Sequence, residues 1–159
     1  MADSDGQTVV GLLTDTGVDR LTVDNCTFMG DSSVGGTAAI RLIGGDQHLI
    51  KNNTLYGDYD TTGAAIENLT TATTNVHIVG NNIWNRHTGS IVCINAVSTS
   101  TGSINYNLLQ MELNGISGGI TDTGTGATNF ALFENYYSNL DGEAGALCLG
   151  GGGLSISTT

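Results

Sequence analysis

Apolar and polar residues alternate along this chain in short runs that return at a nearly constant interval. In the run from Leu21 to Asp24 every second residue is apolar, and this period of two predicts a strand buried on one face. Similar runs lead into three stretches with an Asn where the strand should turn: Lys51-Asn52-Asn53, Gly80-Asn81-Asn82 and Asn105-Tyr106-Asn107. The recurring positions are Asn53, Asn82, Asn107 and Asn135, and Cys26 stands at a similar interval before the first of them.

Five copies of a unit of about 27 residues indicate a repeat protein. One copy cannot bury its own apolar face, so the copies must pack on one another. At a strand spacing of about 4.8 Å, an Asn at each inward bend reaches the Asn of the next copy and forms a hydrogen-bonded ladder. Aliphatic residues at matching positions are expected to fill the interior: Val23, Ile50, Val79 and Ile104.

The length of 159 residues fits one domain. We expect a loose N-terminus over residues 1–7, the repeats over 8–149, and a glycine hinge with an unfinished strand over 150–159. No apolar stripe of period 3.6 persists for three turns, so no substantial helix is predicted. The 24 Gly residues suit repeated turns, and the absence of Pro leaves backbone N–H groups free to pair strands.

The pattern of an Asn followed two positions later by Leu, Ile or Phe, after a strand and at a period in the twenties, resembles the repeats of right-handed parallel β-helix proteins. This family includes pectate-lyase-like enzymes and bacteriophage tail-spike proteins, and the resemblance covers residues 8–149. It implies an all-β, single-stranded right-handed parallel β-helix (a solenoid) of about five coils. A β-sandwich or jelly roll also has many short strands and Gly turns, but it would not explain Asn at matching positions.

Charge and cysteine content narrow the function classes. Four basic against 15 acidic residues give a net charge of −11, which disfavours nucleic acid and anionic membranes as partners. No apolar run approaches the roughly 20 residues of a membrane span, and the first five residues lack the basic and apolar regions of a signal peptide. The three cysteines, Cys26, Cys93 and Cys148, give no complete disulfide framework, and their apolar surroundings predict buried free thiols.

A column of turn residues after the Asn bend, with a second pair of residues beside it, could carry chemistry. The column is Asp31, Asp58, Arg86 and Glu112, and the pair is Asp60 and His87. Carboxylates near an Arg and a His can act as acid, base or cation site, with calcium the metal to consider. In the enzymes that the chain resembles, an acidic calcium cluster or paired Asp residues act on acidic sugars. This chain lacks the adjacent Asp-Asp pair, the Gly-His-Gly and the Arg-Ile-Lys of the polygalacturonase-like branch. We therefore carry over no catalytic residue and expect solvated turn residues with a stacked Asp58–Arg86 pair.

Other polar and aromatic positions have mainly structural interpretations. Arg41 and Glu67 lie one repeat apart and predict an ion pair on a surface strand. His48 and His77, also about one repeat apart, are expected at outward strand positions, where a metal pair would lack further ligands. Trp84 is expected to pack in the core. The alternative is a sugar-stacking strip of aromatic residues: Trp84, Tyr56, Tyr106, Tyr136 and Tyr137.

The leading functional hypothesis is a non-enzymatic structural protein at a virion surface. The resemblance to tail spikes implies a homotrimer that decorates or stabilises a phage capsid or tail, with a capsid or tail protein as partner and no cofactor. The alternative is a carbohydrate-active or polysaccharide- and receptor-binding β-helix of the lyase or glycoside hydrolase class. It would bind a cell-surface polysaccharide through the turn column. A bacterial adhesin would need an export signal.

Overall fold

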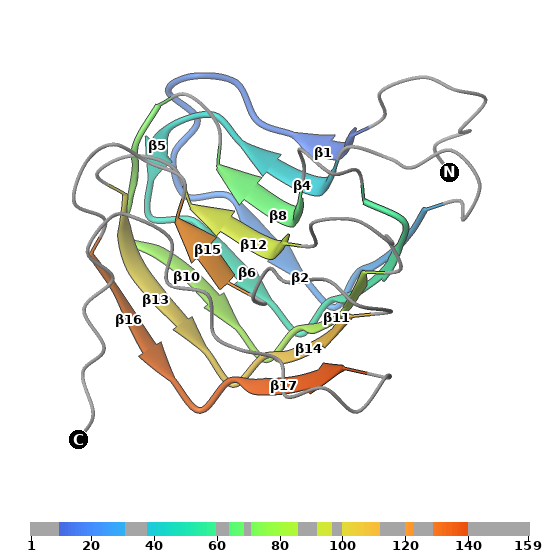
Figure 1. Ribbon diagram of the computed structural model, residues 1–159. Coiled ribbons are helices and arrows are strands. Elements are labelled where there is room, and N and C mark those ends of the chain that lie inside the picture. Colours follow the sequence, from blue (N-terminus) through green and yellow to red (C-terminus); the bar gives the residue numbers. More distant parts are fainter. Residues whose placement is uncertain are drawn as a thin grey trace.

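A computed structural model of the chain describes eight segments (Figure 1): residues 10–30, 38–59, 64–68, 71–85, 92–96, 100–111, 120–122 and 129–139. Within these segments the backbone forms strands and turns and no helix, so the all-β class is confirmed for this part of the chain. None of the described residues belongs to a helix of the length and apolar character that a membrane crossing requires. The predicted loose N-terminus and the glycine hinge lie outside the described residues.

Three five-stranded sheets and one two-stranded sheet contain the described strands, and every pairing is parallel (Figure 1). Sheet A consists of β1 (Val10–Leu13), β4 (Ala38–Leu42), β8 (Ala64–Asn68), β12 (Val92–Ala96) and β15 (Ile120–Asp122). Sheet B consists of β2 (Thr22–Asp24), β6 (Leu49–Lys51), β10 (Val76–Val79), β13 (Thr101–Asn105) and β16 (Asn129–Phe133). Sheet C consists of β3 (Thr27–Met29), β7 (Thr54–Gly57), β11 (Asn82–Asn85), β14 (Leu108–Met111) and β17 (Tyr136–Asn139). The small pair is β5 (Gly45–Asp46) with β9 (Thr73–Thr74).

The order of the strands along the chain follows a fixed cycle. A strand of sheet A is followed by one of sheet B and one of sheet C, and the chain then returns to sheet A beside its previous strand there. Residues that face each other across neighbouring strands lie 26 to 28 positions apart in sequence, as Ile83 does from Leu109 and from Leu55. This interval agrees with the predicted repeat length.

One hydrophobic cluster contains residues of all three large sheets. In sheet B its members are Val23, Ile50, Ile78 and Ile104, which occupy matching positions in neighbouring strands. The prediction that Val79 belongs to this stack is wrong, because the register partner of Ile50 is Ile78 and Val79 pairs with Lys51. Full burial of an aliphatic side chain stabilises the fold by about 1.5–3 kcal/mol. These matched stacks therefore hold the sheets against one another.

The bend between sheets B and C has the same backbone geometry in every repeat. Its first residue has a positive φ each time: Asn25 (54°), Asn52 (54°), Gly80 (65°), Tyr106 (58°) and Glu134 (44°). Gly and Asn tolerate this left-handed region, whereas Tyr and Glu rarely adopt it. The backbone N–H of Tyr106 donates to the carbonyl oxygen of Phe133 at 3.0 Å, as the N–H of Asn52 does to Val79 at 3.1 Å. Backbone hydrogen bonds to the next repeat thus hold the bend. They direct the side chain of the residue after the positive-φ position inward.

Candidate functional site

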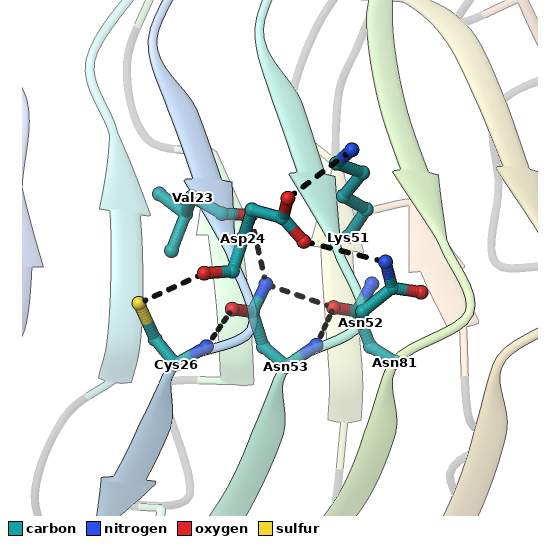
Figure 2. Close-up of polar contacts among 7 residues, drawn as sticks. All are labelled: Val23, Asp24, Cys26, Lys51, Asn52, Asn53 and Asn81. Carbon is teal, nitrogen blue, oxygen red and sulfur yellow. Dashed lines mark hydrogen bonds and ion pairs between the residues drawn. The ribbon is translucent and has the colours of Figure 1, made fainter.

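In four of the five bends between sheets B and C the residue after the positive-φ position is an Asn, and these side chains form a column of buried or partly buried amides. The Oδ1 atom of Asn53 accepts the backbone N–H of Cys26 at 2.9 Å. The Oδ1 atom of Asn81 accepts the backbone N–H of Asn53 at 2.9 Å and its Nδ2 group at 3.0 Å (Figure 2). Asn107 accepts the same two groups of Asn81, both at 2.9 Å, and Asn135 accepts those of Asn107 at 3.1 and 2.9 Å. We call this column, Asn53, Asn81, Asn107 and Asn135, the amide ladder.

Each amide of the ladder also binds the backbone of the repeat before it. Their Nδ2 groups donate to the carbonyl oxygens of the buried residues of sheet B: Asn53 to Val23, Asn81 to Ile50 and Asn107 to Ile78 at 3.0 Å each, and Asn135 to Ile104 at 2.6 Å. An amide has two donor hydrogens and one oxygen with two lone pairs. The inner amides use all four, so the ladder is satisfied by the chain itself.

Asn82 is not a member of the ladder, contrary to the prediction from spacing. It begins β11 and its side chain is exposed, whereas Asn81 is buried and lies in register with Asn53 and Asn107. The register is ambiguous in the sequence because Asn81 and Asn82 are adjacent, and either one fits the Asn position of the repeat. The better signal is Gly80, which is the left-handed residue of its repeat and must precede the ladder position directly.

Cys26 occupies the end of the ladder and is exposed, which corrects the expectation of a buried thiol. It lies between β2 and β3, and both of these are edge strands of their sheets. Its Sγ atom donates to the backbone oxygen of Asp24 at 3.4 Å (Figure 2). The apolar pattern around a residue predicts which side of the strand its side chain is on. It does not predict whether the strand lies at the edge of its sheet, where a side chain can be exposed. The side chain of Cys93, and Cys148 as a whole, lie outside the described residues.

The predicted turn column is described only at Asp58, which is half-buried and directly follows β7. The other positions proposed for it, Asp31, Asp60, Arg86, His87 and Glu112, lie outside the described residues. The acid, base or cation role of this column therefore stays a prediction. Among the residues that the structure describes, no three His, Cys, Asp or Glu side chains gather into a group that could hold a metal ion.

Arg41 and Glu67 form a largely buried ion pair instead of the predicted surface pair. They are register partners in β4 and β8, and Nε of Arg41 donates to Oε1 of Glu67. The side chain of Glu67 is 1% exposed and that of Arg41 is 17% exposed. Burial raises the pKa of Glu67, while the hydrogen bond and the positive charge of Arg41 act in the opposite direction. Ala39 and Ala65 on the same side of sheet A are buried too, so this side is no solvent face.

The two histidines do not share a face. His48 is fully buried, with Nδ1 3.3 Å from the backbone N of Leu21 and Nε2 3.1 Å from the carbonyl oxygen of Gly44. His77 is exposed, and its Nδ1 lies 2.8 Å from Oγ of Ser103. Because His77 is the register partner of Leu49, His48 lies one position out of line with it. The expected outward position of His48 is therefore wrong.

A second polar cluster, which the sequence did not reveal, lies at the bend between sheets A and B. Oδ1 of Asp46 accepts hydrogen bonds from Oγ1 of Thr74 at 2.5 Å and from Nδ2 of Asn75 at 2.8 Å. These bonds, that of Thr74 foremost, lower the pKa of the Asp46 carboxyl. Asp19 accepts the backbone N–H of Asp46 at 2.9 Å. The cluster joins neighbouring repeats on the surface.

Four of the described aromatic residues form two edge-to-face pairs. Tyr56 and Trp84 are register partners in sheet C and meet edge to face, with ring centroids 4.9 Å apart. Trp84 is half-buried, and its neighbour Ile83 takes the core position that was predicted for it. Tyr106 and Phe133 meet in the same way at 5.4 Å, where the chain bends toward sheet C. The side chain of Tyr137 lies outside the described residues.

Comparison of the chain with protein-family models, with curated proteins and with solved structures gives no match.

Proposed function

We propose that the chain folds as a right-handed parallel β-helix of about five coils. The cyclic order of sheets A, B and C, the parallel pairing and the constant interval between register partners support this proposal. A crossover between parallel strands of one sheet is right-handed in about 98% of cases, which supports the hand.

This β-helix serves as a non-enzymatic structural protein of a virion, where a homotrimer decorates or stabilises the capsid or tail. The amide ladder is the observation that carries the structural role. The amides of Asn53, Asn81 and Asn107 are buried and bind neighbouring repeats. Each is therefore committed to holding the repeats together, and a rod built in this way suits a rigid building block.

The virion and the trimer rest on further support. The repeats resemble those of tail-spike proteins, and the charge of −11 favours a surface that stays soluble and repels nucleic acid. Large apolar side chains are exposed on both edge strands of sheet C, Met29 on β3 and Tyr136 on β17. A closed threefold assembly is one symmetric way to cover such residues.

Light scattering coupled to size-exclusion chromatography tests the assembly. The purified chain is expected to show the mass of three copies, with and without EDTA. The mass of one copy at micromolar concentration would contradict the homotrimer. An antibody raised against the chain is expected to label the surface of virus particles recovered from a culture that carries its gene. Labelling of cell debris alone would contradict the virion role.

A polysaccharide-binding or polysaccharide-cleaving β-helix is the second candidate. Exposed aromatic rings favour it, since Tyr106 is 50% exposed beside Phe133 and Tyr136 is 64% exposed. Rings of this kind stack on sugars. A reducing-end assay against acidic and neutral bacterial polysaccharides tests cleavage, and loss of cleavage in a folded Asp58→Ala variant would support it. Absence of binding and cleavage by the natural chain would count against it.

A further inference from the structure

Among the three large sheets that the structure describes, sheet C alone has strands without a charged residue. The strands β3, β7, β11, β14 and β17 contain no Asp, Glu, Lys, Arg or His. Their core positions belong to Leu55, Ile83 and Leu109, which are fully buried. Alternation along the strands therefore directs the residues on either side of them away from the core. We call this outward side of the five strands the uncharged face.

Side chains on the uncharged face are apolar or neutral and in part accessible. Met29 is 69% exposed at one edge of the sheet and Tyr136 is 64% exposed at the other. Between them Thr54 and Asn82 are exposed and are register partners, and Trp84 is half-buried. The face thus runs across the whole sheet from one edge strand to the other.

The other two large sheets do carry charged residues. Sheet B holds Asp24 and Lys51 at its surface, with carboxylate and amine 3.2 Å apart, whereas in sheet A Glu67 is buried and paired with Arg41. Two copies of a chain with a net charge of −11 repel each other over most orientations. On the uncharged face identical copies can meet without opposing carboxylates from its five strands. A basic partner would find no carboxylate on it, so charge favours a second copy as its occupant.

We propose that copies of this chain associate side by side through the uncharged face of sheet C. This inference rests on the homotrimer of the proposed function and names the surface that forms it. Five strands of about four residues cover on the order of 300 Å², against roughly 800 Å² per partner in a standard interface. The face is therefore the centre of a larger interface, and the association depends on concentration.

A matched pair of Thr→Glu variants tests the surface. Thr54→Glu puts a carboxylate on β7, the strand between the central strand β11 and the edge strand β3 of the uncharged face, and Thr22→Glu puts one at an exposed position of sheet B. At a concentration where the natural chain has the mass of three copies, Thr54→Glu is expected to fall to one third of that mass and Thr22→Glu to keep it. Circular dichroism checks that both variants stay folded.

Fluorescence of Trp84, the one tryptophan of the chain, gives a second measurement that needs no variant. Dilution of the natural chain is expected to shift the tryptophan emission to longer wavelength over the range in which the mass falls. A Thr54→Glu variant that remains trimeric, or a Thr22→Glu variant that dissociates equally, would overturn the uncharged face as the interface and leave the homotrimer standing. A natural chain that is monomeric would overturn both the interface and the homotrimer. This holds even if a polysaccharide shifts the tryptophan emission of the monomer.

Discussion

Asn53 and Asn81 are joined by two hydrogen bonds to one atom: the Oδ1 of Asn81 accepts both the backbone N–H and the side-chain Nδ2 of Asn53, at 2.9 and 3.0 Å. Asn81 also donates to the carbonyl oxygen of Ile50 in the repeat before it. One buried side chain thus satisfies groups of two neighbouring strands. The amide ladder repeats this relationship down the chain, and the stability of the fold should depend on it.

Replacement of Asn81 by Ala should lower the free energy of unfolding by about 2–3 kcal/mol, because it leaves buried donors of Asn53 without an acceptor. Asn82→Ala is the matched control one position away. Its side chain is exposed, and the expected change is within about 0.5 kcal/mol. Urea unfolding followed by circular dichroism measures both. Equal losses in the two variants would show that the ladder adds no stability at this rung.

Gly102 approaches another backbone so closely that it should tolerate no side chain. Its φ is 152°, and a Cβ atom there would lie 1.8 Å from the carbonyl oxygen of Val76. Gly17 also has a positive φ, of 82°, but a Cβ atom there would meet nothing within 4 Å. Gly17→Ala should therefore cost only the backbone strain, about 1–2 kcal/mol.

Gly102→Ala should cost several kcal/mol more than Gly17→Ala, because β10 and β13 must separate to accept the methyl group. Thermal unfolding of both variants compares the two costs. A similar midpoint for both would mean that the strands move apart without penalty.

The sequence predicts the period and the all-β class because both follow from local patterning. It misplaces residues where the interval between repeats varies by one position, so that it predicts Asn82 and Val79 at the positions that Asn81 and Ile78 occupy. It also fails for Glu67, since alternation identifies one side of a strand but not what covers that side. Only the three-dimensional structure shows that this carboxyl is buried.

His48 offers a test of the same point in a single side chain. It is fully buried with both ring nitrogens in contact with backbone groups, so His48→Ala should lower the free energy of unfolding by about 2–4 kcal/mol through lost packing and hydrogen bonds. His77 is exposed, and His77→Ala should change it by at most about 0.5 kcal/mol. Chemical unfolding of the two variants beside the natural chain compares these losses. A larger loss for His77 would refute the buried position of His48.

Glu67 should make the stability of the chain depend on pH. Burial raises its pKa above the ordinary value of 4.5, and Arg41 opposes that rise only in part. The folded chain therefore holds this proton more tightly than the unfolded chain. The resulting stabilisation is fully present below pH 4.5 and is lost as the pH rises through the folded pKa. Glu67→Gln stays neutral at every pH and removes this dependence.

The difference in free energy of unfolding, Glu67→Gln minus the natural chain, should consequently increase as the pH rises from 4.5 and then level off. Its total rise is about 1.4 kcal/mol for each unit by which the pKa is raised. Arg41→Gln removes the positive charge that opposes the rise in the pKa of Glu67. The free energy of unfolding of this variant should therefore fall more steeply with rising pH than that of the natural chain. Urea unfolding of the three proteins from pH 4 to pH 8 measures these slopes. A difference that falls with rising pH would mean that Arg41 outweighs burial and lowers the pKa of Glu67.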